Sequence, residues 1–109
     1  MAQNPRLVTT SGTAALLWQT STGVPPDTAL NSSNGIYRAG TFNDPLPIII
    51  ENQDATNSVT LGGSGVTAGG AGTILVAGAS ITRNVAGNDS EYVIANAGTP
   101  KVSVQPGRQ

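Results

Sequence analysis

The acidic residues are the main candidates for chemistry in this sequence, because it contains no histidine and no cysteine. Without an imidazole or a thiolate, a Ser–His or Cys–His nucleophile cannot form, and a zinc site would need carboxylate ligands alone. Glu51 and Asp54 flank one predicted turn, and Asn88, Asp89 and Glu91 bring oxygen atoms together at another. Such clusters can hold Ca²⁺, but in turns they more commonly accept hydrogen bonds from their own backbone. We therefore expect no metal ion, no cofactor and no catalytic residues.

Two further kinds of active site can be checked against the sequence. A phosphate-binding loop needs a Lys and a helix after its glycines, whereas Gly62–Gly65 is followed by no Lys and then by a predicted strand. A glycosidase needs two carboxylates in a cleft, which aromatic side chains would line, and the chain has only four aromatic residues. The sequence therefore predicts that the chain is not an enzyme. We expect the Gly-rich stretch at 62–72 to be a flexible connector or a place where backbones approach closely.

Charge is scarce, with five basic and six acidic side chains among 109 residues. Nucleic-acid binding requires a basic stripe, and attachment to anionic membranes requires basic clusters, so neither partner is expected. A surface of Ser, Thr, Asn, Gln and Gly is typical of proteins that pack on one another or work outside cells. Residues 1–6 are polar and no apolar run is long enough to span a bilayer, so we expect no signal peptide and no membrane segment.

The pattern from residue 36 onward predicts β-strands. Short runs rich in β-branched residues recur every 8–12 positions, with Asn, Asp, Gly and Pro between them and no helical run. The expected strands are 36–42, 46–51, 58–61, 73–76, 80–85, 91–95 and 101–105. The run Leu-Pro-Ile-Ile-Ile-Glu at 46–51 is expected to be central and buried on both faces. The sequence thus predicts an all-β, antiparallel sandwich or barrel, jelly-roll-like, with about seven to eight short strands.

Residues 1–35 differ from this pattern, because loop-forming clusters occupy most of their length. We expect a loose, extended N-terminal arm at 1–35, a β-sandwich domain at 36–105 and a flexible tail at 106–109. The arm contains two short apolar pieces, at 7–8 and 14–18. The second could be one helical turn or a strand, and its Thr- and Gly-rich flanks favour extended structure.

Bulky side chains are too few for a comfortable core. The chain has one Trp, two Tyr, one Phe and 14 Gly, so the ordering cost is high relative to the apolar surface that can be buried. Burial against another subunit would offset that cost. Trp18 is expected to contact another chain rather than the core, whereas Tyr37 and Tyr92 are expected in the core. The predicted partner-contact residues are Leu7, Val8, Leu16, Leu17 and Trp18.

Several segments together carry a family resemblance. They are Ile36–Gly40, Asp44–Ile48, Leu61–Thr67, the Ala-Gly-Ala-Ser turn at 77–80, Glu91–Ala95 and the Val-x-Val at 102–104. This order, and above all Leu-Gly-Gly-Ser-x-Val-Thr at 61–67, resembles small β-sandwich virion proteins of tailed bacteriophages and prophages, of the capsid decoration or head-fibre type. The resemblance covers about two-thirds of the chain. Val93 departs from the small residue usual after the Tyr, and the stretch between Thr67 and Thr73 is unusually Gly-rich.

The resemblance implies a capsid decoration, or cement, protein without catalytic residues. Such a protein is made in the host cytoplasm and sits on the outer surface of the virion head. Its expected partners are the major capsid protein and copies of itself, as a trimer or dimer. The alternative is a tail-fibre or head-fibre module that binds a glycan of the host surface, for which exposed aromatic side chains would be needed.

Overall fold

The structure, a computed structural model, describes residues 5–22, 31–39, 46–85 and 87–107. These residues form nine β-strands and no helix. The strands are β1 (Arg6–Thr9), β2 (Ala15–Ser21), β3 (Ile36–Arg38), β4 (Leu46–Asn52), β5 (Val59–Gly62), β6 (Thr73–Leu75), β7 (Ser80–Val85), β8 (Ser90–Ala95) and β9 (Lys101–Pro106). The all-β prediction is confirmed, and every strand expected after residue 36 has a counterpart.

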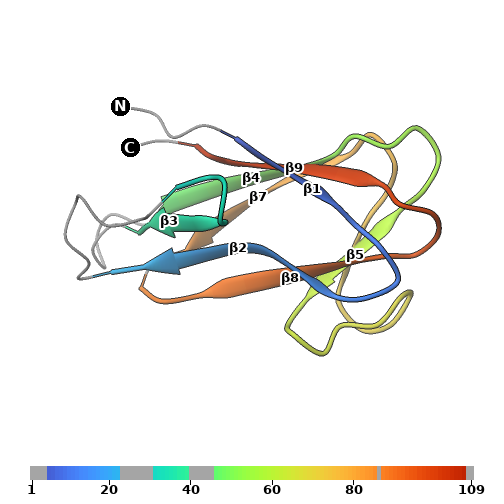
Figure 1. Cartoon of the computed structure of the whole chain (residues 1–109), viewed down its shortest axis with the longest axis horizontal. Coiled ribbons are helices and arrows are strands. Elements are labelled where there is room, and N and C mark those ends of the chain that lie inside the picture. The colour runs from blue at the N-terminus through green and yellow to red at the C-terminus, as the bar shows by residue number, and fades with distance from the viewer. Residues whose placement is uncertain (1–4, 23–30, 40–45, 86, 108–109) are drawn as a thin grey trace.

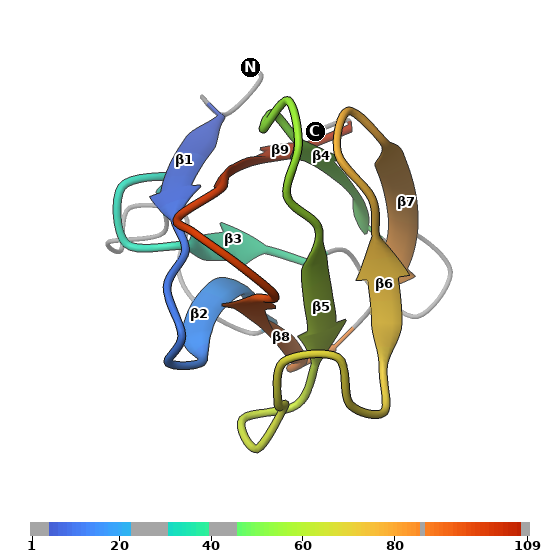
Figure 2. The same ribbon diagram turned by 90° about the vertical axis from the view of Figure 1, so that its right-hand side faces the viewer.

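The strands form two sheets that pack face to face (Figures 1 and 2). One sheet has the order β1-β9-β4-β7 and the other β3-β2-β8-β5-β6. With β3 set aside, the first strand pairs with the last, the second with the next to last, and so on inward to the β5–β6 hairpin, all antiparallel. This nested pairing is that of a jelly roll. Strand β3 adds one parallel pairing, to β2, at the edge of the second sheet.

The nested order corrects the expected loose arm at 1–35. Strand β1 pairs with β9 in one sheet, and β2 pairs with β8 in the other, so the described part of the arm belongs to the sandwich. The break predicted at residue 35 is therefore not a domain boundary. The tail predicted at 106–109 is also shortened, because Pro106 ends β9 and is buried. Residues 108 and 109 lie outside the described residues.

The core lies between the sheets, where inward side chains alternate with outward ones along each strand. On β4, Leu46, Ile48 and Ile50 are buried, whereas Ile49 and Glu51 are exposed. The strand is central, between β9 and β7, but it is buried on one face only, which corrects the expectation of burial on both. A sandwich of two sheets leaves each sheet one outward face, and Ile49 simply lies on it.

Tyr37 fills the core as predicted, whereas Tyr92 does not. The Tyr37 side chain is completely buried, and its hydroxyl donates a hydrogen bond of 3.5 Å to the carbonyl oxygen of Val104 in the opposite sheet. Burial raises the pKa of Tyr37 to about 12, while the positive charge of Arg6 acts in the opposite direction. Tyr92 is half-buried and lies opposite Leu16 on β2, outside the core cluster.

The raised pKa of Tyr37 predicts a loss of stability in strong alkali. In the unfolded chain this phenol ionises near pH 10. At lower pH both the folded and the unfolded state keep the proton, so the raised pKa does not change the free energy of unfolding there. Between pH 10 and 12 only the unfolded state releases the proton, and the free energy of unfolding should fall by about 2 to 3 kcal/mol. Urea denaturation at pH 9 and pH 11.5 measures this. Tyr37→Phe should lose clearly less stability than wild type over the same interval; an equal loss would assign the effect to other groups.

The Gly-rich stretch between β5 and β6 is the hairpin of the jelly roll, and it folds against β5. Val66 is buried against Gly62, and the Gly69 amide donates to Asn96 Oδ1 at 2.8 Å. Gly72 has φ +144°, and a Cβ there would collide with the Leu61 carbonyl oxygen. Of the two expected roles, the close approach of backbones is the one that the structure shows.

Candidate functional site

The five predicted partner-contact residues separate into buried and accessible positions. Val8, Leu17 and Trp18 belong to the core, and Trp18 is only 2% exposed. Their predicted role as contacts with another chain is therefore wrong. Leu16 is half-buried, and Leu7 on the edge strand β1 is 55% exposed. Leu7 is thus the member of the set that another subunit could reach most readily.

A bulge in β2 explains why so many neighbouring side chains turn inward. The register of β2 against β8 shifts between Leu16 and Trp18, so that Leu17 and Trp18 are both buried. The side chain of Arg6 crosses from β1 in the other sheet, and its Nη1 donates to the carbonyl oxygens of Leu16 and Leu17 at 3.1 and 3.0 Å. The extra residue of a bulge leaves backbone groups without a strand partner, and Arg6 satisfies them here.

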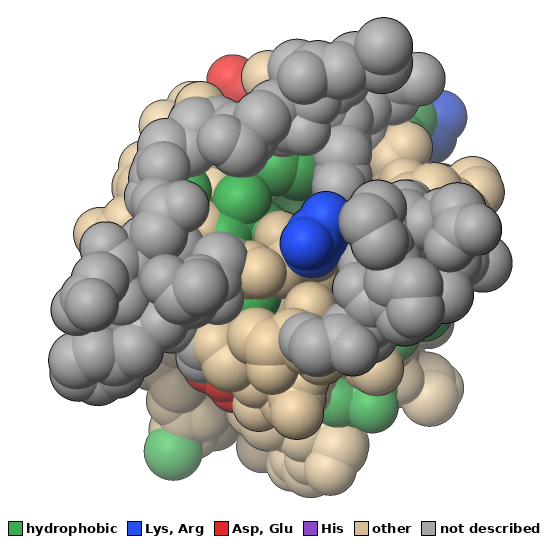
Figure 3. Space-filling view, turned by 90° about the vertical axis from the view of Figure 1, so that its left-hand side faces the viewer, with side chains coloured by type: hydrophobic (Ala, Val, Ile, Leu, Met, Phe, Trp, Pro, Cys, Tyr) green, Lys and Arg blue, Asp and Glu red, His purple; other side chains and the backbone are tan. Residues whose placement is uncertain are grey.

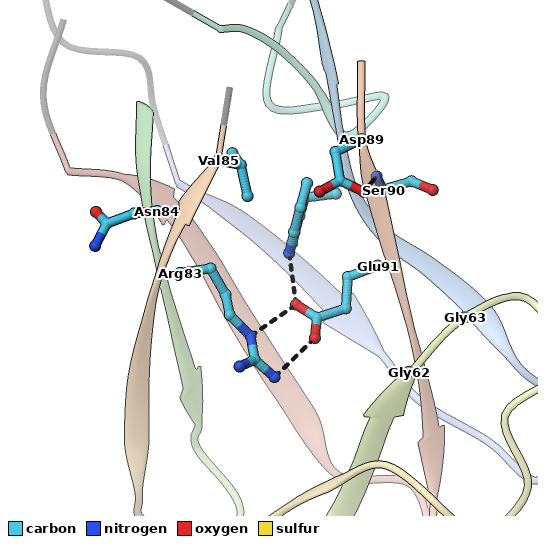
Figure 4. A pocket seen from close by; sticks show the side chains of 9 residues that line it. Gly62, Gly63, Arg83, Asn84, Val85, Asp89, Ser90 and Glu91 are labelled. Carbon is cyan, nitrogen blue, oxygen red and sulfur yellow. Dashed lines mark hydrogen bonds and ion pairs between the residues drawn. The ribbon is translucent and has the colours of Figure 1, made fainter. Parts of the chain in front are cut away.

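A polar depression of about 320 Å³ opens between the two sheets, next to β7 and β8. Figure 4 shows the side chains that line it, and Arg83 on β7 reaches across toward Glu91 on β8. The lining residues are Trp18, Gly62, Gly63, Arg83, Asn84, Val85, Asp89, Ser90 and Glu91. Among the described residues, this is where an ion pair joins the two sheets.

Glu91 is the centre of this depression. Its Oε1 accepts from the Trp18 indole Nε1 at 3.0 Å and from Arg83 Nε at 3.3 Å, and its Oε2 accepts from Arg83 Nη2 at 2.9 Å. Arg83 Nη2 also donates to Thr73 Oγ1 on β6 at 3.0 Å. The Glu91 side chain is 11% exposed and that of Arg83 is 29% exposed. A nearly buried carboxylate is stable in this position because the fork of the guanidinium and the indole N–H together compensate its charge.

This geometry joins the two sheets and offers little to a substrate. Both carboxylate oxygens of Glu91 already accept hydrogen bonds, so no lone carboxylate is presented as a base. The turn acids behave as backbone acceptors: Asp54 accepts from the amides of Thr56 and Asn57, which lowers the pKa of its carboxyl group. In the described part of the chain no three acidic side chains come together as metal ligands would.

The Arg83–Glu91 pair was missed at the sequence level, although a signal was present. Along β7, Ile81, Arg83 and Val85 share the inward face, so the alternation itself places a cation in the interior. A buried cation requires a partner. Its identity depends on how β7 and β8 face each other across the sandwich, and residue spacing alone does not give that arrangement.

The accessible apolar side chains lie in two separate places. Leu7 and Ile49 are exposed on the outer face of the β1-β9-β4-β7 sheet, and Ile74 and Val76 are exposed at the β6 edge of the other sheet. The described part of the chain contains no helix long and apolar enough to cross a bilayer. Comparison with models of protein families, with curated proteins and with solved structures finds no match for this chain.

Proposed function

We propose that this chain is a structural protein of a tailed-bacteriophage virion, a decoration protein on the outer surface of the head. It would bridge neighbouring subunits of the major capsid protein and so oppose the outward pressure of the packaged DNA. The support from the sequence is the resemblance carried by residues 61–67 and their neighbours, together with the lack of histidine and cysteine. The proposal includes no catalytic step, no cofactor and no nucleic-acid contact.

The outer face of the β1-β9-β4-β7 sheet is the observation that carries this proposal. Its outward positions hold Leu7 and Ile49 among Ser, Thr, Asn and Gln side chains, and the charged side chains there are Lys101 and Glu51. A sheet face that is nearly free of charge can approach another protein surface with little desolvation cost. We place the capsid contact on this face, which moves it from the apolar pieces at 14–18 to strands β1 and β4.

At the end of the molecule shown in Figure 3, a Lys or Arg side chain (blue) lies beside hydrophobic side chains (green) among the atoms that are not grey. Jelly rolls are common in capsid proteins and also in lectins, so the fold by itself does not decide between a shell protein and a glycan-binding module. The described aromatic side chains favour the shell, because Trp18 and Tyr37 are buried and cannot stack on a sugar, which leaves the half-buried Tyr92 as the partly accessible one.

The copy number in particles tests the role. The particles to purify are those of a tailed phage whose genome encodes this chain. We expect quantitative mass spectrometry to find the chain in them at a copy number comparable to that of the major capsid protein. A few copies per particle would favour the fibre alternative. Absence from purified particles would contradict both virion roles.

Two substitutions on the proposed docking face test where the chain binds. Leu7→Lys combined with Ile49→Lys should abolish binding to purified heads that lack the chain, while the far-UV circular dichroism spectrum stays that of the wild type. The matched control is Ile74→Lys combined with Val76→Lys, which adds the same two charges at comparably exposed apolar positions on the other sheet. We expect the control still to bind heads. Equal loss of binding in both variants would contradict docking through the β1-β9-β4-β7 face.

A further inference from the structure

Strand β6 is the edge of the β3-β2-β8-β5-β6 sheet and pairs with β5 along one side only. Within the described residues no strand pairs with its other side. The backbone N–H and C=O groups of an open edge can pair with another extended segment. The sandwich has three further sheet edges, so the question is what distinguishes β6 from them.

The other edges carry charged side chains, which natural sheets use to discourage pairing. Strand β1 begins with Arg6, β3 ends with Arg38, and β7 has the inward Arg83. Strand β6 and the turn after it, 73–79, contain no charged residue and no proline. By composition, β6 is the least protected of the four edges.

The side chains of β6 and of Val76, which follows the strand and accepts a hydrogen bond from the Ala79 amide in the next turn, also expose apolar area. Ile74 is 48% exposed and Val76 is 58% exposed, while Leu75 between them is buried in the core. Ile74 in β6 and Val76 just after it therefore lie on the same, outward side of the sheet. Directly inward from Ile74 on that face, Thr60 and then Ile94 follow in register and are both buried. Of these three side chains in register, the one at the edge of the sheet, Ile74, is therefore exposed, while the two further in are covered.

The lack of charged residues around this edge favours a second copy of the chain as its occupant. From Ala55 to Thr82 no residue is charged, and this run includes β5, the Gly-rich loop, β6 and the first half of β7. The charged group that reaches β6 is the guanidinium of Arg83, which donates to Thr73 Oγ1 and is already paired with Glu91, so an acidic or basic partner would find no free charge at this edge among the described residues. A second copy of the chain presents the same neutral surface, so it meets no like-charge repulsion, and its edge has the same open backbone groups.

We propose that β6 pairs antiparallel with β6 of a second copy, with Leu75 opposite Leu75 across a twofold axis. In this register Ile74 of each copy faces Val76 of the other, so all four exposed side chains become direct cross-strand pairs on one face. A twofold contact of this kind uses the same patch on both subunits and closes at a dimer, so it does not propagate into fibres. The β3-β2-β8-β5-β6 sheets of the two copies would then form one continuous sheet across the dimer.

This inference goes beyond the proposed function, because it concerns the contact between copies and involves no capsid protein. It is tested on the purified chain alone. A monomeric chain that still decorates heads would overturn the β6 dimer and leave the docking face of the other sheet standing. A dimer that fails to bind heads would do the reverse.

Cysteine cross-linking tests the register, and the cysteine-free sequence makes the experiment clean. Directly opposite residues have Cα atoms about 4.5–5.5 Å apart, within disulfide range, whereas diagonal neighbours are about 7–8 Å apart. Ile74→Cys combined with Val76→Cys should give a disulfide-linked dimer on mild oxidation. Ile74→Cys alone should give much less. Equal cross-linking by the single and double variants would overturn the proposed register.

Sedimentation velocity over a concentration series tests the dimer itself. The wild type should sediment as a dimer, and Ile74→Lys combined with Val76→Lys should sediment as a monomer with an unchanged circular dichroism spectrum. Leu7→Lys, at an exposed position on the edge of the other sheet, should remain dimeric. A wild type that stays monomeric at its highest soluble concentration would overturn the proposal, as would dissociation by Leu7→Lys.

Discussion

Trp18→Ala should destabilise the chain by about 3–5 kcal/mol, because truncating a buried aromatic side chain leaves a cavity that the core fills only partly. Trp18 is among the largest completely buried side chains, and its indole N–H also satisfies Glu91. A domain of this size has a total stability of about 5–15 kcal/mol, and a core with few bulky residues places this one toward the low end. Circular dichroism and urea denaturation at 25 °C should show a chain that is largely unfolded or close to it.

Leu7→Ala is the control, and it should change the free energy of unfolding by no more than about 0.5 kcal/mol. Leu7 lies in the same N-terminal third, but its side chain is more than half exposed. If the N-terminal third were an arm that ordered only on a partner, both substitutions would leave the isolated chain equally stable. That result would contradict the place of β2 in the core.

The same reasoning explains why the N-terminal third was misjudged from the sequence. Prediction of strands relies on alternation, and the bulge at Leu17 removes alternation from β2, where residues 14–18 are all apolar. Strand β1 has only four residues, too few for a pattern to stand out. Both strands belong to the sandwich because they pair with β9 and β8, which are distant in the sequence, and local residue spacing does not reveal such pairing. Deleting residues 1–35 would remove two core strands, so that truncation cannot isolate a binding role.

The later strands were predictable because local and distant constraints agree there. Strands β7 and β9 alternate between inward and outward residues, β4 is a β-branched run, and Asn-, Gly- and Pro-containing turns separate the strands. What this pattern cannot give is the pairing order of the strands. The outward face with Leu7 and Ile49, the open edge at Ile74 and the depression around Glu91 each combine residues from strands far apart in the chain. Each of these three features can therefore be identified only once the pairing of the strands into sheets is known.

Removing the guanidinium that neutralises Glu91 is expected to have the second largest effect. Arg83→Met keeps much of the aliphatic length of the side chain but leaves a carboxylate that is 11% exposed with only the Trp18 indole as a donor. Breaking a buried ion pair costs about 3–5 kcal/mol. Because the Arg83 side chain is 29% exposed and partly screened by water, we expect about 2–3 kcal/mol in urea denaturation.

A double-mutant cycle separates the pair from its parts. Glu91→Leu alone should cost about 1–3 kcal/mol, since it leaves the buried Trp18 N–H without its acceptor while Arg83 can turn toward water. Arg83→Met combined with Glu91→Leu should cost less than the sum of the two single changes, because an apolar pair no longer leaves a charge unpaired between the sheets. The difference gives the coupling energy. Strict additivity would mean that the two sheets are held by their apolar core alone, and that the pair merely occupies the opening between β7 and β8.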